Sequence, residues 1–154
     1  MTTTAALLAR ARERLIGAPR EALGVVRTSR WRADRIVRAG DAWRLGVLLL
    51  TDDAVLAAGE VLRAAEEVRR GYTAESSRAR AERRAMARRG GFAEGEIVHV
   101  GWVTLDPDAV DAGGASGPLA LLDGRPAVRW SPAGGLMPLA GYLDEKVALL
   151  REGT

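Results

Sequence analysis

The chain contains no cysteine and has only one histidine, His99, and one lysine, Lys146. The lack of cysteine excludes disulfides, thiolate metal sites and cysteine nucleophiles. A serine triad would need His99 as its base, but no serine stands in a Gly-x-Ser-x-Gly motif. Metal binding would have to rely on carboxylates, and the acidic segment 106–111 follows a calcium-loop pattern only in part. We therefore predict no metal and no cofactor, and a structural role for His99.

Long hydrophobic runs are also missing. The run Val47–Leu50 is far too short to span a bilayer, and Ala5–Ala9 is too short for a signal peptide. The 154 residues are 47% hydrophobic and 28% charged, which is typical of a globular protein. These features predict one domain over residues 1–154, cytoplasmic and without a transmembrane segment.

Arginine is abundant, with 22 copies, and its distribution is uneven. Residues 1–90 carry 19 basic and 11 acidic side chains (+8), whereas residues 91–154 carry 4 basic and 9 acidic ones (−5). Opposite net charges on the two halves favour attraction between the halves themselves or between copies of the chain, and the arginine-rich half could bind an acidic protein partner. We expect a homo-oligomer.

Hydrophobic periodicity predicts helices over residues 4–16 and 138–150. A helix over 74–89, whose apolar side is thin, is predicted from the candidate N-cap Thr73 and from the charges in its first and last turns. Strands are expected at 35–38, 43–49, 55–61, 96–105, 119–122 and 125–130. Turn residues 51–53 and the dipeptide Asp123-Gly124 would close two hairpins, and residues 106–117 are expected to form an acidic loop. The predicted fold is α+β, with about six mostly antiparallel strands packed against the C-terminal helix, plus an N-terminal and a central helix.

The segment WRLGVLLLTDDAVLAAGEVLR (43–63) resembles part of pleckstrin-homology-like and GRAM-like domains, which implies a barrel of that type. The whole chain also resembles a group of small, uncharacterised actinobacterial proteins, including the segments RRGGFAEGE (88–96), GPLALLDGRPAVRWS (117–131) and PLAGYLDEKVALL (138–150). Some of those proteins carry an automatic glutaminase label. The Ser-x-x-Lys nucleophile of serine-dependent glutaminases is absent, because Leu143 stands three residues before Lys146.

Two groups of residues are candidate binding sites. The pairs Trp43-Arg44 and Arg129-Trp130, together with His99, would suit an acidic and partly apolar ligand if they lined one cavity. The predicted helix over 78–89 presents arginines that could bind a polyanion, chiefly Arg80, Arg83, Arg84 and Arg88. Few aromatic side chains that could stack on bases stand near this helix in the sequence, so nucleic acid is the weaker candidate.

The sequence therefore favours a non-catalytic binding or protein-interaction module that associates with itself. One alternative is a glutaminase-like amidohydrolase that uses His99. The other is polyanion or nucleic-acid binding through the arginines of residues 78–89.

Overall fold

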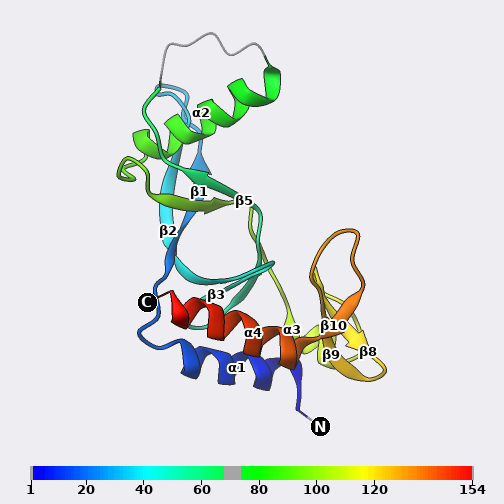
Figure 1. The fold of residues 1–154 in the computed structure, drawn as a ribbon. Helices are drawn as coiled ribbons and strands as arrows, with labels where there is room; N and C mark the ends of the chain where they lie inside the picture. Colours follow the sequence, from blue (N-terminus) through cyan, green and yellow to red (C-terminus); the bar gives the residue numbers. More distant parts are fainter. Residues whose placement is uncertain (1, 68–73, 154) are drawn as a thin grey trace. The chain divides into compact units, whose positions relative to one another are not determined.

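The computed structural model describes residues 2–67 and 74–153, and the predicted N-cap Thr73 lies outside them. The described part is α+β, as predicted, with elements in the order shown in Figure 1. The helices are α1 (Thr4–Leu15), α2 (Glu75–Arg89), α3 (Pro107–Asp111) and α4 (Leu139–Glu152). Within the described residues, no helix is long and apolar enough to cross a membrane.

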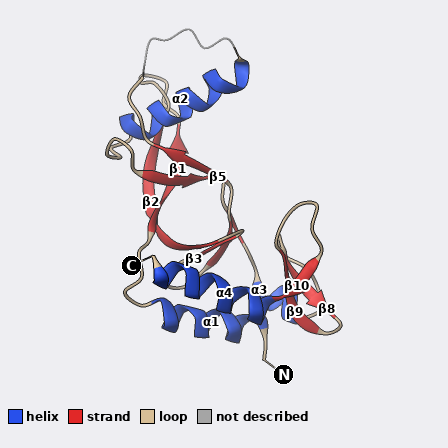
Figure 2. Cartoon of the chain, viewed as in Figure 1, coloured by secondary structure: helices blue, strands red, loops and turns tan. Residues whose placement is uncertain are grey.

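Ten strands are present in the described residues, more than the six or so predicted. Figure 2 distinguishes strands from helices by colour. Their bounds are β1 (Glu21–Arg27), β2 (Arg35–Leu45), β3 (Leu48–Leu50), β4 (Val55–Ala57), β5 (Glu60–Arg63), β6 (Ile97–Val100), β7 (Val103–Thr104), β8 (Leu119–Leu122), β9 (Arg125–Arg129) and β10 (Leu136–Pro138). Hydrogen bonds join seven strands in the order β5-β6-β1-β2-β3-β4-β7, and β10-β9-β8 form a second sheet. The larger sheet is mixed and open, so the barrel implied by the pleckstrin-homology-like resemblance is not confirmed.

The chain divides into two compact units, and the assignment of residues 1–154 to one domain stays a prediction. Unit 1 comprises residues 1–20, 42–58 and 102–154, and unit 2 comprises residues 21–41 and 59–101. Each unit has its own cluster of buried apolar side chains.

The core of unit 1 is formed by α1 and α4, which lie side by side (Figure 1), together with β2, β3, β8 and β9. Leu8, Leu15 and Leu143 are almost completely buried, as the apolar stripes of the two helices predict. The hairpin of β8 and β9 turns at Asp123 (φ 52°) and Gly124 (φ 75°). Both residues have positive φ, which is the reason that this dipeptide predicts a tight hairpin.

A single strand predicted over residues 43–49 is wrong, because the chain turns at Gly46 between β2 and β3. Gly46 has φ 65°, and an added Cβ would lie 2.1 Å from the hydroxyl oxygen of Tyr142. That hydroxyl accepts a hydrogen bond from Val47 N and donates one to Leu45 O, both at 2.8 Å. The turn therefore depends on a residue of α4 that is distant in sequence.

In unit 2, β6 lies between β5 and β1, which agrees with the central position expected for this strand. It is antiparallel to β5 and parallel to β1. The predicted strand 96–105 was too long, because Gly101 (φ 70°) separates β6 from β7. One sheet face and the side of α2 bearing Met86 and Ala87 form the core of this unit.

Candidate functional site

The arginines of α2, predicted to bind a polyanion, mostly contact other groups of unit 2. Arg83 forms a bidentate ion pair with Glu60 on β5, with Nε to Oε1 at 2.5 Å and Nη2 to Oε2 at 2.6 Å. The hydrogen bond from Arg83 lowers the pKa of Glu60 against the opposing effect of burial. This ion pair holds α2 against β5.

Two further arginines of α2 cover the free edge of β5. Arg80 Nη2 donates to Val61 O at 3.3 Å, and Arg84 Nε donates to Arg63 O at 2.9 Å. Four helical residues advance by about 6 Å, and two strand residues advance by about 6.6 Å. The spacing of these arginines therefore matches that of alternate carbonyls on the strand, and their side chains cover acceptors that another strand could otherwise bind.

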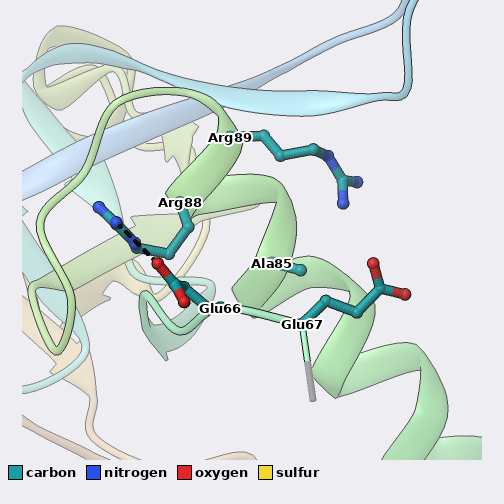
Figure 3. A pocket seen from close by; sticks show the side chains of 5 residues that line it. All are labelled: Glu66, Glu67, Ala85, Arg88 and Arg89. Carbon is teal, nitrogen blue, oxygen red and sulfur yellow. Dashed lines mark hydrogen bonds and ion pairs between the residues drawn. The ribbon is translucent and has the colours of Figure 1, made fainter. Parts of the chain in front are cut away.

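The last two arginines of α2 line a cavity of about 270 Å³ together with Glu66, Glu67 and Ala85. Arg88 Nη2 donates to Glu66 Oε1 at 3.3 Å, and Figure 3 shows this pair in contact, with Arg89 extending away from it. Arg88 also donates to Phe92 O at 2.7 Å, and its Nε lies 3.4 Å from Glu94 Oε2. The carboxylates already balance the cations here, so the cavity offers a small anion little net attraction.

His99 lies on β6 and is completely buried. Its Nε2 donates to Glu21 Oε1 at 2.7 Å, and its Nδ1 is buried without a hydrogen-bond partner. No serine or threonine hydroxyl of the described residues is hydrogen-bonded to this ring. The amidohydrolase alternative therefore stays a prediction that no contact in the described part of the chain supports.

The other candidates for an acidic, partly apolar ligand have different environments. Trp43 is buried in the core of unit 1, where its Nε1 donates to Ala18 O at 3.1 Å and Arg20 stacks over its ring. Arg44 is exposed at the neighbouring position of β2. The burial of Trp43 makes it a packing residue rather than the wall of a ligand cavity.

Arg129 and Trp130 lie at the end of β9. Arg129 Nη1 donates to Gly134 O at 2.9 Å, and the Trp130 ring packs where a Cβ on Gly134 would fall, although Trp130 is still 52% exposed. Arg129 also lines a mainly apolar hollow of about 280 Å³, together with Val47, Gly117, Pro118, Ser131 and Pro132. Neither Trp43, Arg44 nor His99 lines this hollow.

Residues 107–111 of the predicted acidic loop 106–117 form helix α3, whereas the rest of that segment is outside any helix or strand. Asp106 Oδ1 accepts a hydrogen bond from Ala109 N and so caps α3. Asp111 Oδ1 accepts one from Thr4 N at 2.8 Å, and its Oδ2 accepts one from Ala5 N at 3.2 Å, at the start of α1. Aspartates at helix N-termini satisfy free amide groups. No group of three potential ligands that could hold a metal ion occurs in the described ranges.

One exposed surface was not predicted from the sequence: the last two residues of β1 and the turn to β2, residues 26–34, here together called the β1–β2 loop. Trp31 is 88% exposed, the highest value among the exposed large hydrophobic side chains of the described chain. Arg27, Arg30 and Arg32 are also exposed, and none of them pairs with a carboxylate of a described residue. Arg30 lies over the Trp31 ring at 5.8 Å. The pattern Arg-x-x-Arg-Trp-Arg is visible in the sequence, but its exposure is not.

No family model matches this chain, and neither a curated protein nor a solved structure matches it.

Proposed function

We propose that this protein is a non-catalytic binding module that recognises an anionic partner through the β1–β2 loop. The observation that carries the proposal is the exposure of Trp31 between two arginines that lack carboxylate partners among the described residues. Tryptophan and arginine are the residues most enriched at the energetic centres of interfaces. A ring left in water costs free energy that contact with a partner recovers.

The base of the β1–β2 loop is anchored, so the exposed residues project from a fixed support. Arg89 donates to Asp34 O through Nε at 3.1 Å and through Nη2 at 2.8 Å. Ile36, two residues further on, is completely buried. A loop held at its base loses less conformational entropy on binding than a free one.

Self-association stays part of the proposal, supported by the charges of +8 and −5 on the two halves. The pleckstrin-homology-like and actinobacterial resemblances also stay predictions. The binding role of the loop depends on none of them.

The proposal can be tested by retention on a heparin matrix, which serves as a generic polyanion. Replacement of Arg30 and Arg32 by glutamine should lower the salt concentration needed for elution, because each lost contact reduces the electrostatic attraction. The control variant R10Q/R125Q removes the same charge from exposed positions on α1 and β9. Equal retention of the two variants would contradict the proposal.

A further inference from the structure

We infer that the anionic partner of the β1–β2 loop is a lipid surface rich in anionic headgroups, with Trp31 inserted among them; this inference rests on the proposed function. The loop combines the two components that interfacial anchors need, namely a large amphipathic ring and several cations around it. Neither component alone would give stable attachment to a membrane.

Apolar and basic side chains are neighbours along a short exposed segment of the loop. Val26 is 51% exposed and is followed by Arg27, and Trp31 is 88% exposed between Arg30 and Arg32. On a membrane, the apolar groups would lie at the boundary of the acyl chains and the guanidinium groups at the level of the phosphates. At this depth the apolar side chains would leave water while the guanidinium groups bind phosphates.

The indole of Trp31 suits this depth better than an aliphatic side chain would. Its ring is apolar and its Nε1–H is a hydrogen-bond donor, so one edge can remain at the polar headgroups while the rest leaves water. The ring lies beside the Arg30 guanidinium at 5.8 Å, so the cation accompanies it to the headgroup region.

A single-stranded nucleic acid fits the β1–β2 loop less well. Such ligands are bound by series of aromatic side chains that stack on successive bases. Trp31 is the only aromatic residue in the loop, and its neighbours on both sides are arginines. A buried small-molecule site also fits poorly, because every residue from Val26 to Asp34 is exposed.

The expected size of the effect follows from the charges and the ring. Each arginine near an anionic membrane contributes about 1 kcal/mol, which corresponds to about fivefold in binding. Loss of Arg30 and Arg32 should therefore weaken binding by about 30-fold. Trp31→Ala should weaken it by roughly tenfold, since much of one large side chain would no longer leave water.

The experiment is co-sedimentation of the full chain with vesicles of phosphatidylcholine containing 40% phosphatidylglycerol, where the composition is chosen as roughly that of a strongly anionic surface. We expect binding that disappears with pure phosphatidylcholine and falls steeply with salt. Binding should be weaker by roughly tenfold in W31A and by about 30-fold in R30Q/R32Q. The control R10Q/R125Q should bind more tightly than R30Q/R32Q. Thermal unfolding of each variant serves as the check on folding.

A second readout is tryptophan fluorescence. Vesicles should shift the emission of the wild type to shorter wavelength, and the shift should be absent in W31F, which retains an apolar ring at this position. Vesicle binding that persists unchanged in W31A and R30Q/R32Q would overturn the inference.

The heparin assay separates failure of this inference from failure of the proposed function. Heparin retention that depends on Arg30 and Arg32, without vesicle binding, would overturn the inference of a lipid surface. The partner would then be a soluble polyanion. Loop-dependent binding of a single-stranded oligonucleotide in place of vesicles would identify that partner as nucleic acid. If the loop variants bound both vesicles and heparin as tightly as the wild type, both proposals would be overturned.

Discussion

Helix α2 and the β1–β2 loop are both rich in arginine, but the structure uses their arginines in different ways. On α2, Arg80, Arg83 and Arg84 bind carbonyl or carboxylate oxygens of β5. In the loop, Arg30 and Arg32 are exposed and have no such partner among the described residues. The density of arginine in a segment therefore does not identify a binding surface, because acceptors within the same protein can occupy the guanidinium groups.

The most severe test of this comparison is the replacement of Gly90 by valine, at the end of α2. A Cβ on Gly90 would lie 1.5 Å from Ile36 O, so the helix end would have to move away from β2. We expect a loss of about 3 kcal/mol in the free energy of unfolding, at the upper end for overpacking. Urea denaturation measures it.

Gly91→Ala is the matched control for Gly90→Val. Gly91 has φ 106° but no atom within 4 Å of an added Cβ, so only backbone strain of about 1 kcal/mol is expected. Equal stability of the two variants would mean that α2 is not packed against Ile36 as described.

The double variant R80A/R84A should have the next largest effect. It exposes Val61 O and Arg63 O on the edge of β5, and we expect a loss of about 1–2 kcal/mol in the free energy of unfolding. Light scattering should also show association that rises with concentration, because an uncovered strand edge can pair with another chain.

The matched variant in the loop is R30A/R32A, which removes the same number of arginines from the other region. Its free energy of unfolding should stay within about 0.5 kcal/mol of the wild type, as for other surface substitutions. If the free energy of unfolding fell by the same amount in both double variants, the distinction between the two arginine-rich regions would fail.

A further expected effect is a pH dependence at Glu60. The pKa of Glu60 is lowered by its hydrogen bond from Arg83, so the folded protein binds a proton at this carboxyl less readily than the unfolded chain. The stabilisation is present above pH 4.5, the ordinary value for this group, and is lost as the pH falls through the lower folded pKa.

Glu60→Gln should cost about 1 kcal/mol at neutral pH. The difference from the wild type should shrink below pH 4.5, as followed by urea denaturation between pH 3 and 7. A difference that does not change with pH would show that the Glu60 charge contributes nothing.

Elements whose signals are local were predicted well from the sequence. The apolar stripes of α1 and α4 and the Asp123-Gly124 turn lie within short windows, and all three are present. Strand β1 was missed, since Gly24 interrupts its pattern. This glycine is required by long-range packing, because a Cβ there would lie 2.5 Å from Ile36 Cγ2.

The candidate sites were harder to predict, because they too depend on contacts between residues that are distant in sequence. Arg83 and Glu60 are 23 residues apart, so their ion pair depends on how α2 docks on β5. Likewise, a tryptophan next to an arginine in the sequence can have a buried ring, like Trp43, or an exposed one, like Trp31. Exposure is a property of the folded chain that local periodicity does not carry.

The contact between Tyr142 and the turn at Gly46 has a consequence for the order in which a newly made chain can fold. The two groups that Tyr142 clamps lie 95 and 97 residues before it, so the ribosome has added most of the protein before the clamp exists. Unit 2 ends at Gly101 and can acquire its core earlier during N-to-C synthesis, at about 5–20 residues per second. Unit 1 has to wait for α4, so a nascent chain halted before residue 142 could have a folded unit 2 while its β2–β3 turn still lacked the Tyr142 hydrogen bonds.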